Sequence, residues 1–517
     1  MSLNKYFSNR IILYFCLIII LAAILRLYNL GNKPHDLYVD EVDIGWNAYS
    51  ILKTGRDEHG KFMPIFFESF GDFKLPAYIY LTTISEAVFG KSAFAVRLTS
   101  ALAGITTITV FILLTQHISK SWKLALLAGL LLTISPWHLL FTRAGFEASL
   151  SRCFTTIGLY CLILDLDRKH KTFFWGITSF ILALYSYHTA RITVPLGLLF
   201  LIVWKIKELP RIFSRKWSFI KIIVLSSATV PFIIYAFSVD GLARAQSQSF
   251  IRDLPSIIKD DHFKTNIWEI EHLTENYLTY FSLDYLFFSG DSIGRHSIPG
   301  MGMTYLWQLP FFLVGMYVGL KRKQTAAFIY FIWFLITPAA AALATPNPHA
   351  LRGLTGSISL TFFVSFGIYI SLSFLKKIRY ATLIFCLTVG YACTLFLHLY
   401  FHHYPKLTSP DWFGGYKEVV EYGFNNSYKY DAVNFTNSML KGYAFLYFYN
   451  DFSPAEVLKA KNYQLNFGKF TFINDPYIKP IDKKVLYVSN QVEIWTGKLL
   501  KVVNNSGDDP AFQIWEN

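Results

Sequence analysis

Three carboxylates follow the first apolar stretch of the chain. Asp40, Glu41 and Asp43 occur in the segment YVDEVDIGWNAYS, soon after a hydrophobic run over residues 11–25. Carboxylates at a membrane surface can remove a proton from a hydroxyl group, orient a partner or hold a cation. The pattern therefore favours acyl or glycosyl transfer to a hydroxyl group, with Asp40 and Glu41 as the candidate catalytic pair.

Another acidic residue, Glu147, begins a later apolar run in the segment RAGFEASLSR. If it faces the same membrane surface, it adds a further catalytic carboxylate, and Asp40 and Glu147 become the candidate ligands of any divalent metal ion. Structural roles are the alternative. Asp40 and Glu41 suit the positive N-terminal end of a short helix, and Arg143 with Glu147 has the spacing of an ion pair on a helix.

Basic side chains occur in the segments that would share this surface. Arginine offers a planar fork for phosphoryl oxygens, while lysine and histidine supply a point charge or a proton. A single arginine at a membrane boundary is otherwise explained by its charge reaching toward water. The candidate phosphate-binding residues are Lys74 in GDFKLPAYIY, His349 and Arg352 in TPNPHALRG, and Arg244, Arg295 and His296 in the 240–303 region.

The composition points to a membrane protein. Of the 517 residues, 53% are hydrophobic and only 16% are charged, which exceeds ordinary globular usage in the apolar direction. The net charge of +14 comes from short basic clusters between apolar runs, which excludes an extended nucleic-acid surface. All five cysteines lie inside apolar runs, so the sequence predicts neither a disulfide framework nor a thiolate metal site.

Apolar runs predict a polytopic α-helical bundle of about eleven transmembrane helices, because a helix needs roughly 20 apolar residues to cross the hydrocarbon core. Basic clusters alternate with the runs, which places the N-terminus in the cytoplasm of a multi-pass plasma-membrane protein and the C-terminus outside. The predicted spans lie near 11–28, 93–116, 122–142, 147–166, 172–187, 191–206, 218–239, 304–320, 325–343, 353–375 and 378–401.

This topology divides the chain into two predicted domains. Residues 1–403 form the membrane domain, with external loops over 29–92 and 240–303. Residues 404–517 contain turn-forming clusters, strand-like runs such as KKVLYVSN and a helical pattern in YKEVVEYGF, which together predict a small extracytoplasmic α/β domain.

The chain resembles the GT-C superfamily of polytopic glycosyltransferases, and within it the protein O-mannosyltransferase and aminoarabinose-transferase branch. The resemblance implies that Asp40 is the catalytic base, that the lysine–proline motif contacting the lipid phosphate falls on Lys74 and Pro76, and that the second acidic position is Glu147. It rests on the segments LRLYNLG, VDEVDIGWNAYSILKTGRDEHGKFMP, KLPAYIYL, FGKSAFAVRLTSALAG, RAGFEAS and NPHALRG.

The resemblance and the topology agree on the donor. Nucleotide sugars are charged and made in the cytoplasm, so an enzyme on the outer face needs a lipid-linked sugar, and a polyprenyl phosphate sugar meets that need. The expected activity is an inverting hexosyl or pentosyl transfer to a hydroxyl of a protein, lipid or glycan, with membrane lipid as partner and no nucleic acid.

A transporter or flippase of a lipid-linked or anionic substrate is the alternative, and it would place polar residues deep in the spans.

Overall fold

The chain folds into two compact units. The helical unit comprises Met1–Tyr28, Ser100–Thr142 and Phe146–Leu397, and the mixed unit comprises Asn29–Thr99, Arg143–Gly145 and His398–Asn517. The computed structural model describes residues 9–517 except 70–71, 169–171, 209, 211–222, 224–226, 239–240, 242–247, 257–261, 376–378, 437–438, 440, 461, 474–482 and 491–496.

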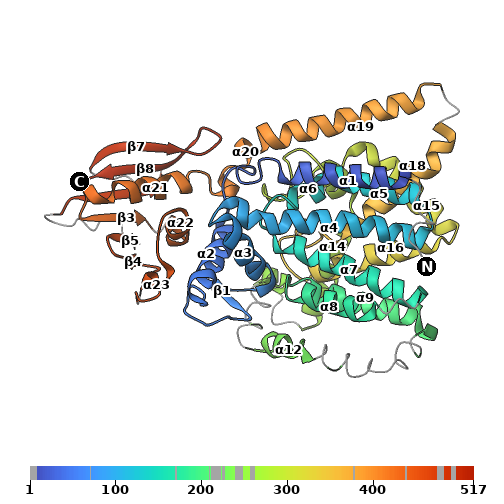
Figure 1. Ribbon diagram of the computed structural model, residues 1–517, viewed down its shortest axis with the longest axis horizontal. Coiled ribbons are helices and arrows are strands. Elements are labelled where there is room, and N and C mark those ends of the chain that lie inside the picture. Colours follow the sequence, from blue (N-terminus) through green and yellow to red (C-terminus); the bar gives the residue numbers. More distant parts are fainter. Residues whose placement is uncertain are drawn as a thin grey trace. The chain divides into compact units, whose positions relative to one another are not determined.

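Long apolar helices that run side by side dominate the helical unit (Figure 1). Glycines allow a close approach between α15 and α18. A Cβ on Gly315 would lie 1.9 Å from the carbonyl oxygen of Phe363, so only glycine fits there. The helices are α1 (Asn9–Leu27), α4 (Ala93–Ser119), α5 (Trp122–Ile134), α6 (Pro136–Phe141), α7 (Glu147–Arg168), α8 (Phe173–Leu184), α9 (Ala190–Trp204), α12 (Val230–Ala236), α14 (His262–Thr279), α15 (Leu309–Lys321), α16 (Thr325–Ile336), α17 (Pro338–Ala341), α18 (Gly356–Leu375) and α19 (Ala381–His398).

Several of these helices have the length and apolarity of membrane spans. Among the described residues, four pass both criteria: Asn9–Leu27, Ala93–Ser119, Glu147–Asp167 and Ala381–Leu407. The pair Leu306–Lys321 and Thr325–Ala341, bent by 117°, passes when taken together, and the shorter apolar helices include α5, α8 and α9. The predicted helical membrane protein is confirmed. The count of about eleven spans stays a prediction, because part of the predicted span 218–239 lies outside the described residues.

The mixed unit begins with a helix, a hairpin and a second helix. Helix α2 (Val39–Thr54) has Asp40 and Glu41 in its first turn, where the positive end of the helix dipole stabilises acidic side chains. Gly55 caps its C-terminus with a φ of 70°, a conformation that favours glycine. Strands β1 (Phe67–Ser69) and β2 (Asp72–Lys74) pair antiparallel, and α3 (Pro76–Phe89) follows with a proline in its first turn.

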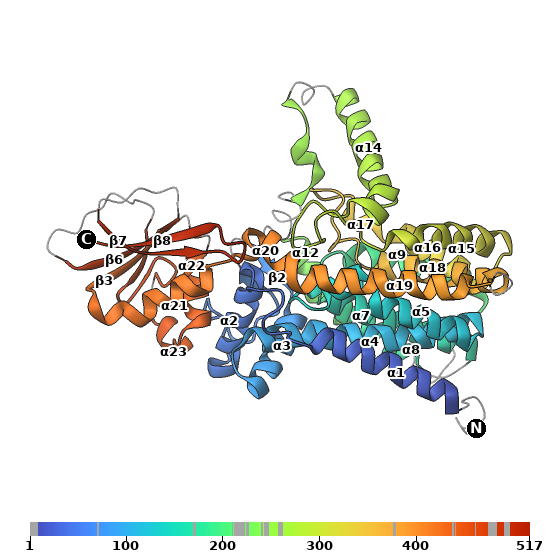
Figure 2. The same ribbon diagram turned by 90° about the horizontal axis from the view of Figure 1, so that it is seen from above.

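The second half of the mixed unit is the predicted α/β domain, which is confirmed. Its described strands form one mixed sheet in the order β4-β5-β3-β6-β8-β7, with β3 parallel to β5 and β6. Helix α21 lies on one face of this sheet (Figure 2), and Gly423 lets it approach Phe435 of β3. The bounds are α20 (Tyr404–Leu407), α21 (Tyr416–Asn426), β3 (Ala432–Thr436), α22 (Gly442–Tyr449), α23 (Pro454–Val457), β4 (Asn466–Phe467), β5 (Phe470–Ile473), β6 (Val485–Asn490), β7 (Lys498–Asn504) and β8 (Pro510–Glu516).

Helix α2 packs against the α/β domain within the mixed unit. The rings of Trp46 and Tyr447 lie 5.4 Å apart, and the ring of Phe448 leaves no room for a Cβ on Gly45. The N-terminal segment of the unit is therefore held by α22, far away in the sequence.

Candidate functional site

An ion pair joins the first predicted catalytic residue to a predicted phosphate ligand. The ammonium of Lys74 donates a hydrogen bond to Oδ1 of Asp40 at 2.6 Å and lies 3.9 Å from Oδ2 of Asp43. The Asp40 side chain is 41% exposed, whereas Lys74 is 11% exposed and Asp43 is fully buried. The carboxylate of Asp40 is thus accessible, while the ammonium of Lys74 and the carboxylate of Asp43 beneath it are buried.

Local structure explains why these groups meet. Asp40 and Asp43 are three residues apart in α2, so their side chains share one face of the helix. The β1–β2 hairpin sets Phe67 opposite Lys74 and Ser69 opposite Asp72. The hairpin brings Lys74 to the two aspartates, and Ser69 donates a hydrogen bond of 2.8 Å to Oδ2 of Asp43.

A second buried carboxylate lies behind Asp43. Asn47 donates to Oδ1 of Asp43 at 3.2 Å and accepts the backbone N–H of Glu58 at 3.0 Å. Burial raises the pKa of Asp43 to about 6, against the opposing effects of Lys74 and Ser69. Burial, and then the charge of Asp43, raise the pKa of Glu58 well above its usual value. Near neutral pH, Asp43 is therefore close to titration.

We expect the stability of the mixed unit to fall as the pH rises through the pKa of Asp43. The folded-state pKa of about 6 exceeds the ordinary 3.8, so the folded state binds the proton more tightly and loses this advantage between about pH 4 and 6. Each pKa unit corresponds to about 1.4 kcal/mol. Thermal unfolding of Asp43→Asn against pH should give a flatter profile than the wild type, and an equally steep profile would refute the assignment.

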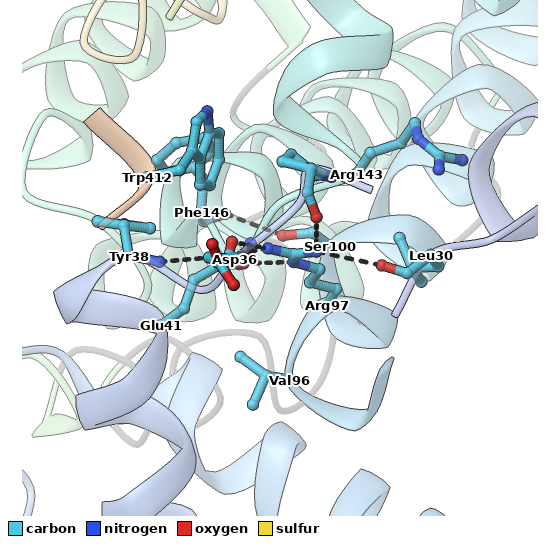
Figure 3. Close-up of polar contacts among 12 residues, drawn as sticks. Leu30, Asp36, Tyr38, Glu41, Val96, Arg97, Ser100, Arg143, Phe146 and Trp412 are labelled. Atoms are coloured by element: carbon cyan, nitrogen blue, oxygen red, sulfur yellow. Dashed lines mark hydrogen bonds and ion pairs between the residues drawn. The ribbon is translucent and has the colours of Figure 1, made fainter. Parts of the chain in front are cut away.

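Both oxygens of the Glu41 carboxylate accept hydrogen bonds from neighbouring groups (Figure 3). Its oxygens accept hydrogen bonds from Arg97 at 2.9 and 3.1 Å, from the amide of Gly145 at 2.6 Å and from the amide of Tyr38 at 3.3 Å. Arg97 also donates to the carbonyl oxygens of Leu30, Pro34 and Asp36. Both side chains are fully buried. The pair fixes the segment that enters α2.

Two open, polar grooves border helix α21 in the mixed unit, with volumes of about 560 and 490 Å³. Lys417 and Glu421 of that helix line both grooves. The first contains Lys33, His35 and Asp36 of the segment before α2. Hydrogen-bonding side chains make up most of the first groove, which suits a hydrophilic ligand.

In the helical unit, a buried carboxylate contacts one of the two histidines that the sequence assigns to phosphate binding, and the second histidine lies beside the first. Oδ2 of Asp291 lies 2.9 Å from Nδ1 of His296 and accepts the backbone N–H of Ala350 at 2.6 Å. The rings of His296 and His349 are 4.5 Å apart. Burial lowers the pKa of both histidines, and Asp291 opposes this effect at His296 without reversing it. The charges of Arg352 and Arg295 lower both pKa values further. Both imidazoles are therefore neutral near pH 7.

Tyr280 and Gly290 position this cluster. The Tyr280 hydroxyl donates to Asn347 at 2.8 Å and accepts the backbone N–H of His349 at 3.1 Å. Gly290 has a φ of 74°, and a Cβ there would lie 2.7 Å from the carbonyl oxygen of Met301. Glycine is required directly before Asp291 for both reasons.

The remaining predicted residues have different outcomes. Arg352 is half-buried and donates to Gln248 and to the carbonyl oxygen of Thr345, both at 3.0 Å. Glu147 is the half-buried first residue of α7. Arg244 lies outside the described residues.

Comparisons with known proteins agree with this architecture. Residues 74–235 match the family model of dolichyl-phosphate-mannose-protein mannosyltransferases. The crystal structure of ArnT from Cupriavidus metallidurans bound to undecaprenyl phosphate superposes with a TM-score of 0.61 at 10% identity, covering 97% of each chain. The same protein in the apo state gives a TM-score of 0.55 with the same coverage. The chain has the ArnT fold.

Two relatives come from Aquifex aeolicus (strain VF5), and both are uncharacterized proteins. One is 23% identical over 402 residues, which is 75% of this chain and 70% of that protein. The other is 28% identical over 164 residues, which is 31% of this chain and 37% of that protein. Neither relative adds information on activity.

The ArnT fold and the mannosyltransferase family match confirm the predicted resemblance to GT-C glycosyltransferases. They support a multi-pass membrane protein related to glycosyltransferases.

Within this ArnT-like fold, the structure adds residues that the sequence analysis did not assign to the site. Asp43 was visible as an acid three positions after Asp40, a spacing that places both on one helix face. Asp291 precedes His296 in the segment FFSGDSIGRHS, and its type and proximity were the available signals. Glu58 and Tyr280 gave no signal, because their positions depend on contacts that the sequence does not display.

Proposed function

We propose that the chain is a glycosyltransferase that moves a sugar from a polyprenyl-phosphate donor to an acceptor hydroxyl on the outer face of the membrane, with inversion at the anomeric carbon. The observation that carries the proposal is the accessible carboxylate of Asp40, held at 2.6 Å by the buried ammonium of Lys74. A general base needs both a fixed orientation and access to its substrate.

In the proposed reaction, Asp40 removes the proton of the acceptor hydroxyl as the hydroxyl oxygen attacks the anomeric carbon. The bond from that carbon to the phosphate oxygen breaks, and the lipid phosphate leaves with the electron pair. One displacement inverts the anomeric centre. Asp43 and Lys74 orient the base, and Glu41, whose oxygens are occupied by Arg97 and backbone amides, positions α2. Glu147 remains the proposed second acidic residue.

We assign the leaving phosphate to the basic residues of the predicted set. His349 and Arg352, with Arg295 and His296, supply imidazole and guanidinium groups that suit phosphoryl oxygens. The charges of Arg295 and Arg352 both act on His349, which supports their proximity within the helical unit. Lys74 and Arg244 stay in the proposal as further phosphate ligands. Preorganised cations stabilise the charge that develops on a leaving group.

The polar grooves along α21 support a hydrophilic acceptor, whether protein, lipid or glycan. The proposal includes a plasma-membrane location with the N-terminus in the cytoplasm and residues 404–517 outside, which the alternating basic clusters favour.

An assay of the purified protein in lipid with a panel of polyprenyl phosphate sugars tests this function. We expect at least one donor to be consumed by transfer or by slow hydrolysis, with release of polyprenyl phosphate. Movement of an intact donor across the bilayer without cleavage would instead support the transporter alternative and overturn the proposal.

A further inference from the structure

Three buried side chains of the helical unit have the geometry of metal ligands. One ligand atom from each of Asp291, His296 and His349 lies within 4.8 Å of the other two. Ligands that bind zinc at about 2.0–2.2 Å in a tetrahedron lie roughly 3.4 Å from each other. Small side-chain adjustments are enough to bring the three atoms to that spacing. It is the one such group of histidine, cysteine or acidic side chains that the described residues contain.

His349 provides a second and independent observation. Its Nδ1 atom is buried, and the described residues offer it no hydrogen-bond partner. The residue as a whole is only 8% exposed. A buried polar atom without a partner costs free energy, so a native structure normally satisfies it. A metal ion supplies the missing partner, because a neutral imidazole nitrogen is a good ligand.

Asp291 and His296 also fit a shared cation. The 2.9 Å between Oδ2 of Asp291 and Nδ1 of His296 suits a hydrogen bond and equally suits two atoms bound to one ion. The carboxylate is oriented by backbone N–H groups of Ile293 at 2.9 Å and Ala350 at 2.6 Å. Such outer contacts are typical of carboxylates that bind metals.

We propose that Asp291, His296 and His349 form a three-ligand centre for a borderline transition-metal ion of the zinc class. Two imidazoles and one carboxylate match the ligand preference of zinc and its neighbours, whereas magnesium and calcium prefer an all-oxygen set. Three protein ligands leave a fourth position open.

The open position suits an anionic oxygen. Asp291 alone leaves the ion with excess positive charge, and the charges of Arg295 and Arg352 also act on the cluster. Under the proposed function, on which this step alone depends, the ligand is the phosphate of the lipid donor, and the ion stabilises the charge that develops there. This assignment moves the metal from the pair Asp40 and Glu147, since Lys74 already occupies the carboxylate of Asp40.

Metal content tests the site without any assay of activity. The detergent-purified full chain is incubated with zinc chloride, dialysed against metal-free buffer and analysed by mass spectrometry for zinc. We expect about one ion per chain in the wild type, and an affinity at least about 100-fold lower in His349→Ala, because even outer contacts change affinity by 10–100-fold. Cobalt chloride should give the visible absorption of a tetrahedral cobalt site in the wild type only.

Matched variants separate ligand loss from misfolding. His349→Ala leaves a cavity in place of a buried imidazole and should lower the thermal midpoint in the absence of metal, so its zinc content is measured well below that midpoint. Asp291→Asn keeps an acceptor for the Ala350 amide and should also lose zinc. His402→Ala, an exposed histidine of the mixed unit, should retain it. Absence of zinc from the wild type, or equal retention by His349→Ala, would overturn the proposal.

The two proposals fail separately. Asp40→Asn should bind zinc as the wild type does, because Asp40 is not a ligand. A chain that binds zinc at this site and shows no sugar transfer with any donor would retain the metal centre and lose the proposed function.

Discussion

Asp40→Asn should reduce sugar transfer by about 10³-fold, within the 10²–10⁴-fold range of general-base catalysis. Asparagine has the same shape and can still accept the hydrogen bond that Lys74 donates at 2.6 Å, so the local geometry is preserved while the basic oxygen is lost. The measurement is the initial rate of polyprenyl phosphate release with the active donor at saturating acceptor.

The control for this substitution is Glu68→Gln on strand β1. Glu68 belongs to the same hairpin region and pairs with Lys61 at 3.1 Å, but its carboxylate is 41% exposed and lies outside the Asp40–Lys74–Asp43 group. Its rate should stay within about twofold of the wild type, since exposed ion pairs contribute little. If Asp40→Asn retains most of the wild-type rate while binding the donor normally, Asp40 is not the base.

Periodicity explains why much of the fold could be predicted from the sequence. Apolar runs required membrane helices, and the helix and strand patterns after residue 404 required an α/β domain, because both signals are local. The pairing of Lys74 with Asp40 involves residues 34 positions apart. The sequence indicates only that the two residues share one surface. The hairpin that creates it is short and contains no strong turn signal.

The groups that were not predicted depend on contacts between distant segments. Glu41 and Arg97 are 56 positions apart, and Asp291 and Ala350 are 59 positions apart. Hydropathy reports that a buried charge needs a partner but does not say which one. The sequence therefore favours a catalytic role for Glu41 beside Asp40, whereas its contacts support a positioning role. The sequence indicates no role for Asp291.

Glu41→Gln should destabilise the protein without removing the chemistry. Loss of one partner leaves a buried, uncompensated charge on Arg97, which typically costs about 3–5 kcal/mol. Both side chains are fully buried, so solvent screening does not reduce this cost. We expect a lower thermal midpoint and faster proteolysis of the segment 29–38, whose carbonyl groups at Leu30, Pro34 and Asp36 accept hydrogen bonds from Arg97.

The comparison of Glu41→Gln with Asp40→Asn separates positioning from catalysis. Folded Glu41→Gln protein is purified at low temperature as a monodisperse fraction, and its rate is expressed per folded molecule. This rate should stay within about tenfold of the wild-type rate, which is a smaller loss than the 10²–10⁴-fold that a general base contributes. Asp40→Asn should show the reverse, an unchanged midpoint and a lost rate. A Glu41→Gln protein with wild-type stability and no turnover would return Glu41 to the chemical step, because a carboxylate that only held Arg97 could not be removed without a change in the folded state.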